Sequence, residues 1–147
     1  QLRWTDTVGR YFPNVETAKR DITLEQLFSH TSALPAGDDV CMSNPLFTLA
    51  TCAERILQQP LIGEPGKVFA YGGNSMQVAG RMAELATGRS WDDLFLDEVV
   101  APLGLIATDY STSSTAPGYV RNANPRIAGG ARSTLDDYGR LVDMVLA

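Results

Sequence analysis

Serine, lysine, histidine and tyrosine are the side chains of this sequence that could carry acyl-transfer chemistry. A serine nucleophile needs a base within hydrogen-bond reach, commonly a histidine or a lysine. Lys19 and Lys67 are the only lysines, and each follows a glutamate three positions earlier, so no Ser-x-x-Lys occurs; Gly-x-Ser-x-Gly is absent too. The sole histidine, His30, follows an expected short helix. We expect its ring to be buried and bonded to backbone rather than to act as a base.

Metal and cofactor chemistry finds no support in the residue pattern. One histidine with dispersed carboxylates offers no ligand cluster at a usable spacing, so we predict no metal site. The glycine pairs Gly72-Gly73 and Gly129-Gly130 lack the strand, loop and helix context of a phosphate cradle, so we predict turns there and no cofactor.

Cys41 and Cys52 are eleven positions apart, with no second cysteine pair and no nearby histidine. This spacing argues against a zinc site and against a disulfide framework. Two free or buried thiols remain open, and so does a single bridge in an oxidising compartment.

The composition is that of an ordinary soluble globular protein. Of the 147 residues, 44% are hydrophobic and 20% charged, which suits one domain with a real core. The net charge of -5 leaves no basic surface for nucleic acid. No apolar run approaches the roughly 20 residues that span a bilayer, and the first residues do not begin a signal peptide. We expect a soluble chain without a membrane partner.

Helical patterns occupy most of the sequence. Thr23 and Gln26 fit a capping box that begins a short helix, and residues 49–58 keep apolar side chains on one face before Pro60. Apolar residues recur at spacings of three and four over residues 75–87, and Gly88 supplies a left-handed stop. These patterns predict three helices, with a loop after Pro60.

The second half of the chain continues the helical pattern around one long loop. We expect a helix over residues 91–100, and a last one over 134–146 whose apolar side chains face inward, namely Leu135, Tyr138, Leu141, Val142 and Val145. Residues 108–130 are rich in loop-forming types. The whole pattern predicts a mainly α single domain over residues 1–147 with few short strands, one of them at residues 68–71. Because the sequence opens in a turn-like segment and stops within a helical pattern, we expect it to be truncated at both ends.

Four segments, in order along the chain, resemble the serine β-lactamase-like hydrolases, which include class C β-lactamases, D-Ala-D-Ala peptidases and carboxylesterases. Residues 22–35 are similar to the family's ITLRHLLTHTSGLP segment, with Ala33 in place of glycine. The other three matches are residues 64–71, similar to PGT-x-F-x-Y; residues 101–108, similar to PLGM-x-x-T; and residues 128–137, similar to AGGL-x-ST-x-x-D.

The resemblance implies the helical domain of an α/β fold. In that family a sheet domain supplies the Ser-x-x-Lys, and a later strand supplies Lys-Thr-Gly or His-x-Gly; neither motif occurs in this sequence. The implied activity of the parent is hydrolysis of an ester or amide through an acyl-enzyme. Relatives are often periplasmic or secreted.

Tyr71 matches the tyrosine of the family's Tyr-x-Asn motif, and its implied role is proton transfer. A phenol, with an ordinary pKa near 10, accepts a proton poorly at neutral pH unless a nearby cation favours the phenolate. Gly73 stands where the motif has asparagine, and Asn74 follows one position later; both are candidate substrate-binding residues. This departure favours an ester substrate over a β-lactam or a peptide.

Three functional hypotheses follow. The first is the helical part of a serine hydrolase that is inactive alone because Ser-x-x-Lys is absent. The second is a non-catalytic binding or assembly module derived from that family, and the third is an enzyme assembled from separate chains. In each case we expect self-association, or binding of the missing sheet-domain segment, through the face that packs on the sheet domain in the family.

Overall fold

The computed structural model describes residues 2–37, 39–111 and 118–147, and within them the chain is almost entirely helix and loop. The elements are α1 Val8–Tyr11, η1 Thr17–Lys19, α2 Leu24–Phe28, α3 Asp39–Met42, α4 Leu49–Gln58, α5 Gly73–Thr87, α6 Trp91–Phe95, η2 Leu96–Val100 and α7 Leu135–Leu146. Extended pairing in the described ranges amounts to two isolated antiparallel bridges, Thr7 with Thr23 and Asp109 with Arg132. The predicted mainly α architecture is therefore confirmed, although residues 68–71 form no strand.

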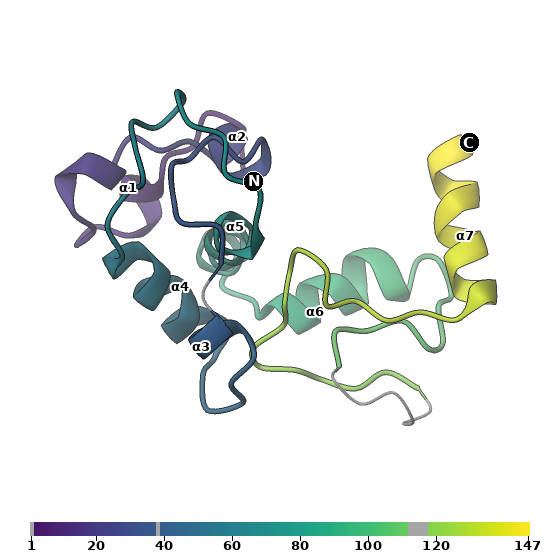
Figure 1. The fold of residues 1–147 in the computed structure, drawn as a ribbon. Helices are drawn as coiled ribbons and strands as arrows, with labels where there is room; N and C mark the ends of the chain where they lie inside the picture. Colours follow the sequence, from purple (N-terminus) through teal and green to yellow (C-terminus); the bar gives the residue numbers. More distant parts are fainter. Residues whose placement is uncertain (1, 38, 112–117) are drawn as a thin grey trace.

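Helices α1 to α5 gather into one lobe, from which α6 runs outward, and α7 stands at the far end (Figure 1). The core of this lobe lies where α4 and α2 pack on α5. Ile56 of α4, Leu27 of α2, and Val78 and Met82 of α5 are fully buried there. Removing such side chains from water is the main stabilising contribution to the lobe, at about 25 cal/mol per Å² of apolar surface.

Local capping signals set the helix ends. Gln26 N donates to Thr23 Oγ1 at 3.2 Å, and Thr23 N donates to Gln26 Oε1 at 3.0 Å, so the predicted capping box is present. Helix α5 begins two residues earlier than predicted and ends at Gly88, whose φ of 71° is left-handed. Such a φ suits glycine because it has no Cβ. None of the described helices is both long and apolar enough to cross a membrane.

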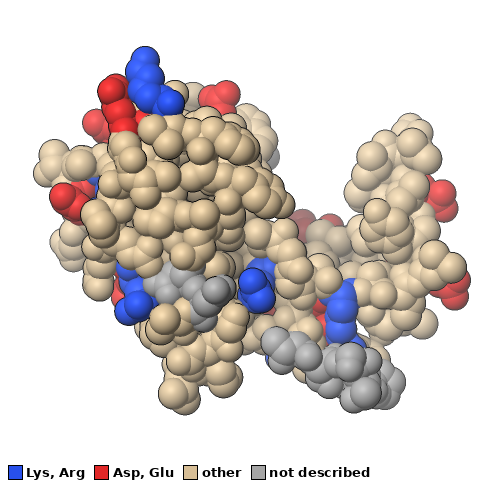
Figure 2. Space-filling view, viewed as in Figure 1, with Lys and Arg blue, Asp and Glu red and all other residues tan. Residues whose placement is uncertain are grey.

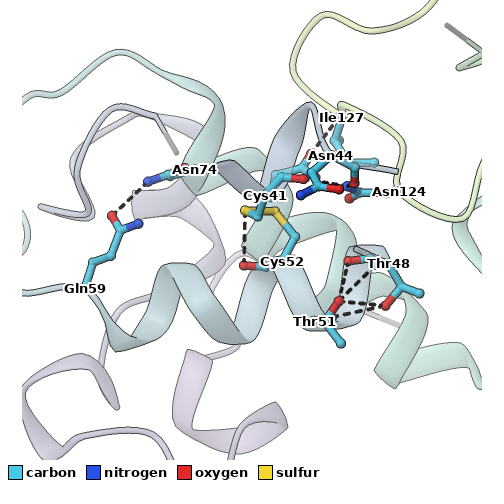
Figure 3. Close-up of a disulfide and its surroundings, with 10 residues drawn as sticks. Cys41, Asn44, Thr48, Thr51, Cys52, Gln59, Asn74, Asn124 and Ile127 are labelled. Atoms are coloured by element: carbon cyan, nitrogen blue, oxygen red, sulfur yellow. Dashed lines mark hydrogen bonds between the residues drawn. A yellow bond between two sulfur atoms is a disulfide. The ribbon is translucent and has the colours of Figure 1, made fainter. Parts of the chain in front are cut away.

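A disulfide between Cys41 and Cys52 ties α3 to α4 (Figure 3), with the two Cα atoms 5.2 Å apart. This settles the question that the spacing left open in favour of a single bridge. The carbonyl of Cys41 also accepts a hydrogen bond from Nδ2 of the buried Asn124 at 2.7 Å. Cys41 therefore links α3 to α4 through the bridge and to the loop around residue 124 through its backbone.

The prediction that the last helix turns its apolar side chains inward is wrong. Leu135 is 85% exposed and Val145 75% exposed, and within the described residues only Asp137 of α7 is buried. Helix α7 is held at its beginning, where Asp137 accepts hydrogen bonds from residues 106–108 and Arg140 donates to the carbonyl of Gly104. Beyond that anchor most of its apolar side chains are exposed, and Figure 2 shows a mostly uncharged surface there.

Candidate functional site

Tyr71 lies immediately before α5, on a segment fixed by backbone hydrogen bonds. Ala70 N donates to the carbonyl of His30 at 2.9 Å, and Gly66 N donates to that of Thr31 at 2.7 Å. The side chain of Tyr71 is 75% exposed, and no hydrogen bond of its phenol is present among the described residues. The backbone is thus held in place while the phenol is exposed to solvent, and the role of Tyr71 in proton transfer stays a prediction.

The ring of His30 supports Tyr71 from one side. The two ring centroids are 4.7 Å apart with planes at 55°, and the ring of Phe69 is 6.1 Å from His30. His30 has a φ of 58°, and its Nδ1 is buried without a hydrogen-bond partner in the described residues. The expectation of a ring bonded to backbone is therefore wrong, because this left-handed residue turns its ring toward two aromatic side chains instead.

Two glycines allow the Tyr71 segment to approach its neighbours closely. A Cβ on Gly72 would lie 1.8 Å from the carbonyl oxygen of Ala36, and one on Gly73 would lie 2.8 Å from Sδ of Met42. Gly73 is the first residue of α5 and is half-buried against Met42. Its predicted role in substrate binding stays a prediction, with the backbone as the part available for contact.

Asn74 points into the lobe. It is fully buried, and its Nδ2 lies 3.5 Å from Oε1 of Gln59 (Figure 3), while its Oδ1 has no partner in the described residues. A substrate contact by this side chain stays a prediction. A neighbouring contact that the sequence reasoning missed is the buried pair of Ser32 Oγ and Ser75 Oγ, 2.8 Å apart, which joins the segment after α2 to α5. Such a pairing across 43 positions has no local sequence signal.

The third and fourth resembling segments meet at Asp137. Its carboxylate accepts hydrogen bonds from Ala107 N at 2.8 Å, from Thr108 Oγ1 at 2.8 Å and from Ile106 N at 3.0 Å, and Thr108 Oγ1 also lies 2.8 Å from Ser133 Oγ. Burial alone would raise the pKa of Asp137, but these hydrogen bonds outweigh it and hold the pKa below its ordinary value. The two segments are therefore joined by one hydrogen-bond network at the start of α7.

Asp109, the residue directly after the third segment, and Arg132 of the fourth form an ion pair beside this network. Two guanidinium nitrogens of Arg132 donate to the buried carboxylate of Asp109 at 2.6 and 2.8 Å, and the two backbones also exchange hydrogen bonds. Burial acts to raise the pKa of Asp109, yet Arg132 and the amides of Ser111 and Val120 lower it overall. Paired, two-pronged contacts of this kind fix geometry more firmly than a single hydrogen bond.

A cavity of about 230 Å³ connects the α3 region with the fourth resembling segment. Met42 and Asn44 line one side, and Arg126 and Gly130 line another. Because Met42 also packs against Gly73, this cavity adjoins the beginning of α5. Its amide and guanidinium groups could bind polar parts of a small molecule.

Comparison with known proteins agrees with this arrangement. The family model described as Beta-lactamase matches residues 1–147. Penicillin-binding protein 4 of Amycolatopsis lactamdurans is 36% identical over 118 residues, which cover 71% of this chain and 29% of that protein. A solved structure from Bacteroides dorei, provisionally assigned as a β-lactamase, superposes with a TM-score of 0.78 at 34% identity, covering 98% of this chain and 42% of its own.

A more distant structure shows the same fold. The β-lactamase/D-alanine carboxypeptidase of Yersinia pestis superposes with a TM-score of 0.76 at 22% identity, covering 96% of this chain and 46% of its own. The chain thus spans less than half the length of each of these relatives. Because the family model covers every residue, the chain belongs to the Beta-lactamase family.

Proposed function

We propose that this chain supplies the tyrosine of an acyl-enzyme serine hydrolase that cleaves a small ester or amide, with Tyr71 as the proton-transfer residue. The observation that carries the proposal is the placement of Tyr71, whose phenol is exposed while its backbone is held by residues 30 and 31. Such a group can exchange a proton with a nucleophile brought to it from another part of the protein. Membership of the Beta-lactamase family supports the same chemistry.

The nucleophile in this proposal comes from outside the 147 residues, because the sequence contains no Ser-x-x-Lys. Residues 1–147 then act as the helical domain of a β-lactamase-like fold, and the isolated chain does not turn over substrate. Gly73 in place of the family's asparagine, with Asn74 turned toward Gln59, favours an ester over a β-lactam or peptide. The Cys41–Cys52 bridge favours an oxidising compartment.

Hydrolysis of p-nitrophenyl butyrate tests this proposal. The isolated chain is expected to show no turnover above buffer. A longer product that includes the flanking coding sequence is expected to hydrolyse the ester, and Tyr71→Phe should lower kcat by roughly 10²- to 10⁴-fold, as for loss of a general acid–base group. Turnover by the isolated chain, or a fully active Tyr71→Phe variant of the longer product, would contradict the proposal.

The apolar surface of α7 favours a second candidate function, that of an assembly module. Leu135, Tyr138, Val145 and Leu146 are each more than half exposed. Contiguous apolar surface of this kind is unfavourable in water and is typical of an interface. On this hypothesis a second copy of the chain covers α7, and light scattering at tens of micromolar should give a dimer or larger mass that Val145→Glu reduces. A monomeric mass would exclude this alternative.

A further inference from the structure

A groove of about 620 Å³ lies on the lobe away from Tyr71, between the segment after α1 and the later turns of α4 and α5. This volume is within the range of small-molecule sites. Arg81 and Leu85 line it eight and twelve residues beyond Gly73, so they lie roughly 12 and 18 Å along the helix axis from the start of α5. The groove is therefore separate from the candidate hydrolase site. Its other relevant lining residues are Tyr11, Phe12, Glu54 and Leu57.

The floor of the groove is apolar, aromatic and held in place. The hydroxyl of Tyr11 donates to Asp6 at 3.0 Å, and Phe12 packs against the hydrophobic core. Leu57 is buried and Leu85 is 40% exposed, so the floor combines a fixed part with an open edge. Aromatic faces attract cations as well as apolar groups, since their quadrupole is negative above the ring.

The charges that line the groove leave one carboxylate unpaired. Glu16 forms an ion pair with the buried Lys19, and Arg81 forms one with Glu84 at 2.8 Å. The carboxylate of Glu54, exposed on α4, makes no ion pair or hydrogen bond within the described parts of the chain. Among the described residues that line the groove, the uncompensated charge is therefore the single negative charge of Glu54, beside an aromatic surface.

We propose that this groove binds a small organic cation, an ammonium attached to an aromatic or branched alkyl group. The ammonium pairs with Glu54, and the apolar group lies on Phe12 and Leu85. Among the described lining residues the one cation is Arg81, whose charge is already balanced by Glu84, so an anion of the same size would meet a lining that carries the extra negative charge of Glu54. Charge complementarity thus favours binding of the ammonium ion over an anion, and the aromatic floor favours a ligand with an apolar group.

Nuclear magnetic resonance titration of the ¹⁵N-labelled chain tests the proposal with two probes of similar shape and opposite charge. The cation 2-phenylethylammonium is expected to shift the amide signals of residues 11–12, 14–16, 54–58 and 81–85 and to leave that of Tyr71 unchanged. The anion 3-phenylpropanoate is expected to bind at least fivefold more weakly. Equal affinity for the two probes, or shifts that map outside the groove, would overturn the proposal.

Two charge-removing variants sharpen the test. Glu54→Gln keeps the shape of an exposed helical side chain and should weaken binding of 2-phenylethylammonium about fivefold, as expected for loss of a partly exposed ion pair. Glu25→Gln removes the same charge from an exposed position in α2 and should leave the affinity unchanged. Unaltered binding by Glu54→Gln, or an equal loss in both variants, would show that Glu54 does not recognise the ligand.

Discussion

Reduction of the Cys41–Cys52 bridge should destabilise the chain by an amount that follows from loop closure. The two cysteines are 11 positions apart, both are fully buried, and the bridge joins α3 to α4. Closing so short a loop restricts the unfolded chain by about 3 kcal/mol in the chain-entropy account. With an unfolding entropy of roughly 2.1 cal/mol/K per residue, this loss lowers Tm by about 10 °C for 147 residues.

Urea unfolding followed by circular dichroism, with and without a phosphine reductant, measures this loss directly. The double variant Cys41→Ala/Cys52→Ala is the control, because its stability should not respond to the reductant. Alkylation with iodoacetamide before reduction should modify neither cysteine. A loss below about 1 kcal/mol on reduction, or alkylation of the native chain, would refute the reasoning, since the bridge would then be absent or would constrain nothing.

Three further predictions concern the site and its supports. Gly72→Ala should lower the free energy of unfolding by about 1–3 kcal/mol in urea titrations, because the new Cβ overlaps the carbonyl oxygen of Ala36; wild-type stability would contradict the close approach. Thr23→Ala should lower the free energy of unfolding by about 1 kcal/mol in the same assay, because the α2 cap is lost, whereas Thr23→Ser should keep most of the wild-type stability. Because folding lowers the pKa of Asp109, its ionised carboxylate stabilises the folded chain above pH 4, and this stabilisation is lost as the pH falls below the ordinary pKa of 3.8. The free energy of unfolding of Asp109→Asn should therefore fall less than that of the wild type between pH 5 and 3. The same fall in both proteins would contradict this.

Local signals in the sequence predicted local structure well. The capping box at Thr23 and Gln26 involves side chains three positions apart, and the stop at Gly88 depends on one residue's φ, so neither needs tertiary information. The order of the resembling segments likewise indicated the family that the comparisons show. Tyr71 was located by this resemblance, because nothing in its neighbours distinguishes it from an ordinary exposed aromatic.

Features that depend on distant contacts could not be predicted in the same way. Asp137 binds amides about thirty positions earlier, and the Ser32–Ser75 pair spans 43 positions. The apolar stripe of α7 led to the wrong prediction of an inward face, because helical periodicity does not specify whether the residues that cover the stripe lie within residues 1–147. The orientation of the His30 ring depends on the left-handed φ of this residue and on two aromatic side chains about forty positions later.

Covalent labelling with a fluorophosphonate tests the central claim most directly, namely that this chain is part of an acyl-enzyme hydrolase and carries no nucleophile of its own. Intact-mass spectrometry of the isolated chain after labelling should show no adduct, while a longer product that includes the flanking coding sequence should carry one adduct on a serine outside residues 1–147. An adduct on any serine within residues 1–147, or an unlabelled longer product that contains Ser-x-x-Lys, would contradict the account.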